Sequence, residues 1–208
     1  MNLSSFISLF KKSTSQTLFL SESLLVKKLK IVSKTNDFSI FENITIYHQA
    51  KNFFIPLLIL SKKHGIFLFE YKAWSYDDLK NAKAQKANTQ STSNNTVAFE
   101  KSHQFIKRKF NELIHSDGIP ISNYLLMQNL NLDQYRHLDS SFHELLPECR
   151  IMFNDSTEAS ILEKMMQNNE EIRENHDVSS AMSTLLIQYA IIDKNKNFHL
   201  ASEEQMRF

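Results

Sequence analysis

The spacing of apolar residues predicts a helix early in the chain, followed by three strands. Between Thr17 and Val32, leucines and a valine recur at intervals that suit one face of a helix, with Ser21 as its cap. Apolar and polar residues alternate over Ser39 to Tyr47, and Phe53 to Leu60 is a second strand-like run. Ile66 to Trp74 is apolar on both faces, which is typical of a strand in the middle of a sheet.

The second half of the chain predicts further helices and two more strands. Phe99 to Ile114 has helical periodicity with a basic outer face, and Glu158 to Gln167 is a later helix. Ile119 to Met127 and Arg150 to Asn154 are strand-like, and Ser179 to Ile191 predicts one more helix. The order of elements predicts an α/β domain, with a mixed central sheet flanked by helices and a short helical C-terminal extension.

Changes in composition divide the chain into three parts. Residues 1–15 form an amphipathic N-terminal segment, and residues 16–168 hold the regular elements of the predicted domain. Within that domain, residues 87–98 are Asn, Thr, Ser and Gln with hardly a hydrophobic residue, which predicts a mobile surface loop. Residues 169–208 are expected to be an acidic linker followed by the helical extension.

Composition excludes several classes of protein. The 208 residues contain 2 glycines and 3 prolines, too few for a β-sandwich with many tight turns. The lone Cys149 excludes an internal disulfide and a cysteine-based zinc site. No apolar run is long enough to cross a bilayer and no signal peptide is visible, so we expect a cytoplasmic protein without an integral membrane segment.

A formal net charge of +1 conceals two halves of opposite sign. Residues 1–115 hold 17 Lys plus Arg against 8 Asp plus Glu, or +9, whereas residues 116–208 hold 7 against 15, or −8. Such a basic half is expected to contact nucleic acid. Solvated lysines or attraction between the two halves are the alternatives. The candidate phosphate contacts are Lys27, Lys28, Lys62, Lys63, Lys107, Arg108 and Lys109.

One pair of charged residues stands out at the end of the predicted central strand. Glu70 and Lys72 are two residues apart, so their side chains project from the same face. Burying both charges among apolar neighbours is costly unless the two are paired or line a functional cleft. A carboxylate that holds Mg²⁺ (or Mn²⁺) and a nearby lysine suit phosphodiester cleavage. The alternative is an ordinary salt bridge.

The run from Gly65 to Ser75 resembles the signature of the NERD (nuclease-related domain) family: glycine, apolar strand, Glu-x-Lys, then an aromatic and a small residue. The resemblance extends over about residues 16–168. It implies a restriction-endonuclease-like PD-(D/E)xK fold. It also implies that Glu70 and the first-helix Glu22 hold the metal, and that Lys72 and Gln104 complete the catalytic set.

The same resemblance also exposes a departure from the family pattern. The strand before Glu-x-Lys normally opens with an aspartate, and Pro56 stands in that place. Glu42, Asp77 or Asp78 are candidates for a displaced carboxylate. Two hypotheses follow: a Mg²⁺-dependent DNA nuclease, or an inactive nuclease-fold module that binds DNA or protein. In either case Trp74 beside the site would stack on a base, or would pack in the core or at the rim.

The final residues carry a second resemblance. Phe198 to Phe208 is similar to the lead-in of a superfamily-one DNA helicase, in which Gln205 would match the glutamine that contacts adenine. No phosphate-binding loop of the Gly-x-x-x-x-Gly-Lys type occurs in the sequence, so an ATPase is not expected. The resemblance implies a helicase or another DNA-processing protein as a partner. The alternative is an ordinary polar C-terminus.

Overall fold

The computed structural model describes residues 23–48, 51–81, 104, 106–108, 112, 119–169, 172, 180, 190–192 and 198–200. The predicted N-terminal segment 1–15 and the polar loop 87–98 lie outside these residues. The helices are α2 (Leu24–Thr35), α3 (Tyr76–Asn81), α5 (Leu132–Arg136), α6 (Ser140–Leu145), the 3₁₀ turn η2 (Glu148–Arg150) and α7 (Glu158–Asn168). The strands are β1 (Ser39–His48), β2 (Lys51–Ser61), β3 (Gly65–Lys72), β4 (Ile121–Met127), β5 (Ile151–Phe153), β6 (Ala190–Ile192) and β7 (Phe198–Leu200).

The strands form one mixed sheet in the order β5-β4-β3-β2-β1-β7-β6. Strands β1, β2 and β3 pair antiparallel, whereas β4 lies parallel to β3 and β5 parallel to β4. Strand β3 therefore has a neighbour on each side, and its first five residues are buried. This arrangement confirms the predicted α/β class and the predicted central position of the Glu-x-Lys strand.

Helix α2 forms because its apolar residues lie on one side. Leu25, Leu29 and Val32 are buried and fall at helical spacing, while Ser23 occupies the N-cap position. The helix runs three residues beyond the predicted end at Val32 and finishes at Thr35. The residues from Thr17 to Glu22, where the helix was expected to begin, lie outside the described part of the chain.

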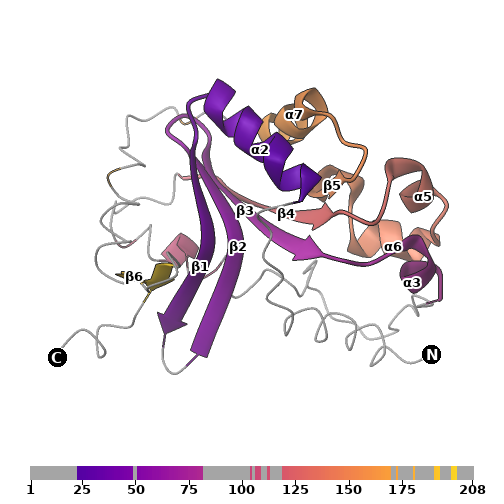
Figure 1. Ribbon diagram of the computed structural model, residues 1–208, viewed down its shortest axis with the longest axis horizontal. Helices are drawn as coiled ribbons and strands as arrows, with labels where there is room; N and C mark the ends of the chain where they lie inside the picture. The colour runs from indigo at the N-terminus through magenta and orange to yellow at the C-terminus, as the bar shows by residue number, and fades with distance from the viewer. Residues whose placement is uncertain are drawn as a thin grey trace.

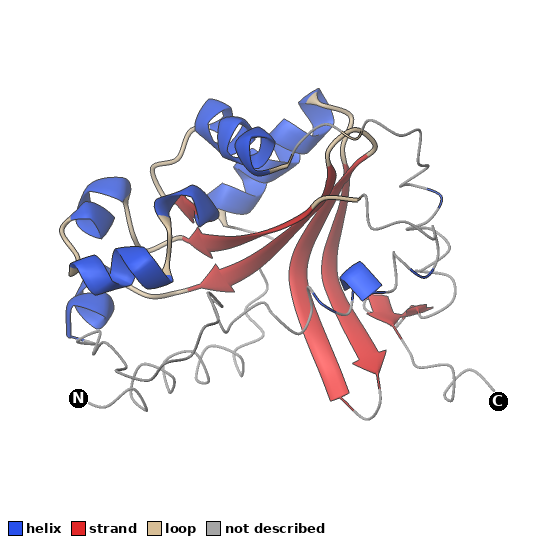
Figure 2. Ribbon diagram, turned by 180° about the vertical axis from the view of Figure 1, so that it is seen from behind, coloured by secondary structure: helices blue, strands red, loops and turns tan. Residues whose placement is uncertain are grey.

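Two apolar clusters lie on opposite faces of the sheet. Helices α2 and α7 cover one face (Figure 1), where Leu57 and Phe69 belong to the same cluster as Leu29. Helices α3, α5 and α6 gather near the ends of β3 and β4 (Figures 1 and 2), over the cluster that contains Trp74, Leu125 and Met127. Because successive residues alternate between faces, each strand residue can be assigned to one cluster or the other.

Gly65 allows the chain to turn into β3 close to the start of β4. Its φ of +80° is strained for any residue with a Cβ, and a Cβ there would lie 2.2 Å from the carbonyl oxygen of Pro120. The next amide, of Ile66, donates to that same oxygen at 2.9 Å. Only glycine permits this close approach, which aligns β3 and β4 in parallel.

The short helices α3, α5 and α6 were not predicted, because each is too short for its apolar spacing to show a period. Helix α5 begins with a capping box, in which Asn131 and Gln134 each bond the other's backbone amide. The S/T/D/N-x-x-E/Q spacing of such a box was visible in the sequence. This pair was the signal that sequence reasoning missed.

The C-terminal region also differs from the expected helix over Ser179 to Ile191. Residues 190–192 form β6, and β7 pairs in parallel with β1. Of the rest of that predicted helix, only Ser180 is described, and it is helical. Strands β6 and β7 therefore extend the sheet, and the predicted helix does not include its last two residues, Ala190 and Ile191. No described helix is long and apolar enough to cross a bilayer.

The chain just after α7 packs onto the turn between β2 and β3. Asn169 is 1% exposed and accepts a hydrogen bond from the hydroxyl of Ser122. Its amide group donates to the carbonyl oxygen of His64 at 2.6 Å, and the amide of Ile172 donates to Lys63 at 2.6 Å. These contacts fix the β2–β3 turn. The domain boundary placed at residue 168 stays a prediction.

Candidate functional site

Glu70 and Lys72 lie at the carboxyl end of β3 and point to the same face of the sheet. They pair with Leu125 and Met127 of β4, both of which belong to the cluster under α3, α5 and α6. The ammonium of Lys72 donates to Oε1 of Glu70. The two side chains therefore share a face of the sheet, as their spacing predicts. The salt bridge between them, which was the alternative interpretation of this pair, is present.

Lys72 is among the most buried side chains of the protein. Only 1% of its side chain is exposed, against 17% for Glu70. Its Nζ lies 5.5 Å from the centre of the Trp74 ring, so the ammonium is placed between a carboxylate and an aromatic face. Burial of Glu70 raises the pKa of its carboxyl, and Lys72 counteracts only part of that rise.

Pro56 lies opposite this pair in the neighbouring strand. Leu57 of β2 pairs with Phe69 of β3, so one further step in the antiparallel register sets Pro56 across from Glu70. Leu57 and Phe69 both point toward α2. Because side chains alternate along a strand, their neighbours Pro56 and Glu70 both point to the opposite face. The position expected to hold an acid thus presents a buried, apolar ring.

The other neighbour of Pro56 is a strained asparagine in β1. Glu42 pairs with Leu57 and Ile44 with Ile55, so Asn43 stands opposite Pro56. Asn43 has a φ of 55°, a conformation that asparagine tolerates better than most residues. Proline has no amide hydrogen to give to the strand ladder, so pairing is interrupted here. Sequence reasoning missed this feature of β1, although an asparagine within a strand was its signal.

The three candidates for a displaced carboxylate are directed elsewhere or lie in α3. Glu42 belongs to the α2 face, opposite to that of Glu70, and forms an ion pair with Lys30 at 2.6 Å. Asp78 accepts hydrogen bonds from the amide and hydroxyl of Ser75 at 2.9 and 2.7 Å, which lowers the pKa of its carboxyl. Asp77 is exposed in the first turn of α3.

These placements decide how well the site suits a divalent cation. Mg²⁺ and Mn²⁺ take several oxygen ligands in a fixed geometry. Among the described residues no group of three His, Cys, Asp or Glu side chains is close enough to hold a metal ion. Glu70 contributes one carboxylate, and Lys72 already occupies one of its oxygens. Glu22 lies outside the described residues, so the described set does not fit the ion.

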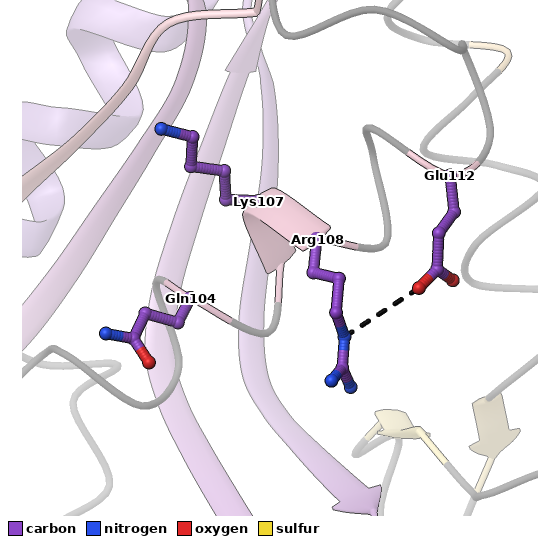
Figure 3. A pocket seen from close by; sticks show the side chains of 4 residues that line it. All are labelled: Gln104, Lys107, Arg108 and Glu112. Carbon is purple, nitrogen blue, oxygen red and sulfur yellow. Dashed lines mark ion pairs between the residues drawn. The ribbon is translucent and has the colours of Figure 1, made fainter.

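Gln104 belongs to a different surface. It is exposed and lines an open pocket of about 490 Å³ together with Lys107, Arg108 and Glu112 (Figure 3). Arg108 and Glu112 form an ion pair at 3.7 Å across this pocket. Of the described residues, the lining includes neither Glu70 nor Lys72. The predicted helix over Phe99 to Ile114 is helical at each of its described positions, and Ile106 within it is buried.

The remaining basic candidates divide into exposed and engaged side chains. Lys27 in α2, Lys62 and Lys63 in the β2–β3 turn, and Lys107 are exposed. Lys28 instead donates to the carbonyl oxygens of Ser156 and Asn154, at 2.6 and 3.5 Å, and thereby ties α2 to the loop before α7. Lys109 lies outside the described residues. Trp74 is 5% exposed and packs in the core, so its indole has no accessible face for a base.

A family model described as a nuclease-related domain, NERD, matches residues 19–135, which is more than half of the chain. The match includes α2, the first four strands and α3, and therefore the Glu70–Lys72 pair. No curated protein and no solved structure matches the chain significantly.

Proposed function

Because the chain belongs to the nuclease-related domain family, we propose that it is a nuclease-fold module that binds DNA without cleaving it through Glu70 and Lys72. The observation that carries this proposal is the position of Pro56 across from Glu70, on the face where a second acid would be required. The restriction-endonuclease-like PD-(D/E)xK architecture is part of the same proposal. It is supported by a Glu-x-Lys strand between an antiparallel and a parallel neighbour.

The environment of the pair supports a structural role for it. Lys72 is enclosed between Glu70 and Trp74, with 1% of its side chain exposed. A lysine that assists phosphodiester cleavage must reach the phosphate. An ammonium held in this way instead neutralises a carboxylate whose burial is costly. The two charges therefore stabilise each other at the end of β3.

DNA binding would use the exposed lysines. Lys62 and Lys63 lie together in a turn. The Asn169 side chain holds this turn by a hydrogen bond to the His64 carbonyl oxygen, and the Ile172 amide by one to the Lys63 carbonyl oxygen. Lys107 and Arg108 line the open pocket with Gln104. Ammonium and guanidinium groups bind phosphates with little regard to sequence, and an amide adds a hydrogen-bond donor. Lys27 is a further candidate phosphate contact. It is exposed on α2 and belongs neither to the turn nor to the pocket.

A salt titration of DNA affinity tests this binding. For the wild type we expect log Kd to rise linearly with log salt concentration, because phosphate contacts release counterions. The K62E/K63E double variant should bind more weakly and show a smaller salt slope. A variant of Lys80, which is exposed in α3 and outside both basic groups, serves as the control. An affinity that does not respond to salt would contradict phosphate binding.

Divalent-metal-dependent cleavage is the second candidate function. It is favoured by the retained Glu70–Lys72 pair at the carboxyl ends of the parallel strands β3 and β4. This candidate requires Glu22 to add the missing carboxylate for Mg²⁺ or Mn²⁺. Its test is plasmid nicking by the wild type and by Glu22→Gln. Metal-dependent nicking that disappears in the variant would support cleavage and replace our first proposal.

A helicase or another DNA-processing protein remains a proposed partner. Gln205, which carries the helicase resemblance, lies outside the described residues. Phe198 to Leu200 pair with β1 as a strand of this sheet, which favours an ordinary structural role for that part of the segment. Stimulation of a superfamily-one helicase by the wild type, and its loss in Gln205→Ala, would support the partnership.

A further inference from the structure

Two apolar side chains on α2 are exposed. Leu24 is 56% and Ile31 49% exposed, and they are the exposed large hydrophobic residues of the described part of the chain. They are seven residues apart, about two helical turns, so they lie on one line along the helix. The opposite side of α2 buries Leu25, Leu29 and Val32 in the core. Helix α2 is therefore apolar on two sides.

Lysines accompany these two side chains. Lys27 and Lys34 are exposed and follow Leu24 and Ile31 by three residues each, which places them beside the apolar pair. No acidic residue occurs from Leu24 to Thr35. We call Leu24, Lys27, Ile31 and Lys34 the outer α2 surface. It combines a short apolar stripe with a positively charged border.

We propose that the outer α2 surface docks an amphipathic, acidic helix of a partner protein. The apolar residues of such a helix would cover Leu24 and Ile31, which are about 10 Å apart along α2 and so match a two-turn spacing in the partner. Asp or Glu residues on its flank would meet Lys27 and Lys34. Apart from Lys27, which is also a candidate phosphate contact, this surface shares no residue with the β2–β3 turn and the pocket proposed to bind DNA.

The small extent of the outer α2 surface favours this occupant over a membrane or DNA. Its apolar part consists of two side chains about 10 Å apart along α2, which one face of a single helix can cover. A helix that lies on a bilayer carries a longer apolar face. DNA phosphates make no favourable contact with the apolar side chains of Leu24 and Ile31. The apolar stripe and the charge pattern therefore fit a protein helix.

Two synthetic peptides test the proposal with the full chain. The first is a helical peptide with leucines at i, i+3, i+4 and i+7 and glutamates on its flanks, and the second has lysines in place of those glutamates. We expect the acidic peptide to bind at least about tenfold more tightly. L24S/I31S should weaken that binding by about tenfold or more. K27E/K34E should reverse the preference between the peptides.

Controls separate docking from misfolding and from DNA binding. Because all four positions are exposed, the variants should keep the melting temperature of the wild type. K62E/K63E should bind the acidic peptide like the wild type, even if it loses DNA. The proposal is overturned if the acidic peptide does not bind, if both peptides bind equally, or if L24S/I31S binds like the wild type. It is also overturned if anionic phospholipid vesicles bind this surface and the acidic peptide does not.

Discussion

The ammonium of Lys72 is held against the carboxylate of Glu70 by their positions two residues apart on one face of β3. Lys72 is almost completely enclosed, whereas Glu70 retains 17% of its side-chain exposure. The two residues therefore respond differently when their partner is removed. Without Glu70, the ammonium of Lys72 has no carboxylate partner and almost no contact with solvent, whereas the carboxyl of Glu70, whose pKa is already raised by burial, can take up a proton when Lys72 is removed.

The first prediction concerns this asymmetry. Glu70→Ala deprives a buried ammonium of its carboxylate and should lower the free energy of unfolding by about 3 kcal/mol. Lys72→Met preserves volume and leaves a carboxyl that can protonate, so it should cost about 1 kcal/mol. Urea denaturation of both variants measures the difference. The double variant Glu70→Leu/Lys72→Met should be within about 1 kcal/mol of the wild type. Equal losses in the two single variants would contradict this account.

The second prediction concerns pH. The raised pKa of Glu70 means that the folded protein binds this proton more tightly than the unfolded chain does. Its contribution to stability is therefore complete below pH 4.5, the ordinary value, and is lost as pH rises through the raised pKa. The unfolding free energy of the wild type minus that of Glu70→Gln should fall between pH 4 and pH 7. A difference that grows with pH would show that the pKa is lowered.

The third prediction separates two adjacent lysines of α2. Lys28 donates to the carbonyl oxygens of Ser156 and Asn154, so Lys28→Met leaves those oxygens without a charged donor. We expect a loss of about 1.5–3 kcal/mol in unfolding free energy, since hydrogen bonds that involve a charged group are worth about that much. Lys27→Met is the matched control, because Lys27 is exposed one position away and should cost less than about 0.5 kcal/mol. Equal effects would contradict the structural role of Lys28.

The fourth prediction concerns the turn into β3. Gly65→Ala would place a Cβ 2.2 Å from the Pro120 carbonyl oxygen at a φ of +80°. The left-handed backbone alone costs about 1 kcal/mol or more, and the clash with rigid backbone adds to it. We expect a loss of at least about 2 kcal/mol, measured by thermal unfolding. Lys63→Ala in the same turn is the control, and a neutral Gly65→Ala would contradict the observed approach of β3 to β4.

Local patterns were enough to predict the central part of the fold. The apolar spacing of α2 and the strand runs of β1, β2 and β3 gave the order of elements, because those residues are buried in the same periodic way. The alternation of side chains along a strand also put Glu70 and Lys72 on one face. The ends were less predictable. Strand β7 depends on pairing with β1 and β6 on pairing with β7, and no local pattern reveals either contact.

The candidate site was less predictable than the fold, because it depends on which face each side chain meets. Glu42 fits the alternation of side chains along β1, but the sequence does not say which face of the sheet it is on. The packing of α2 shows that it points toward Lys30 and away from Glu70. Lys27 and Lys28 are adjacent lysines that the sequence alone does not distinguish. In the structure, Lys28 is the one whose ammonium donates to the loop before α7. Trp74 follows the motif at a position suited to stacking, but the short helices α3, α5 and α6 enclose it, and they were not foreseen.

The fifth prediction tests the central claim, that Glu70 and Lys72 do not form a metal-dependent cleavage site. Supercoiled plasmid is incubated in Mg²⁺ or Mn²⁺ with the wild type, Glu70→Gln and Lys72→Met, after each variant has been shown to be folded. Because Pro56 stands where a second acid is needed, we expect the wild type to nick no more than either variant. Metal-dependent nicking by the wild type that both substitutions abolish would contradict the account.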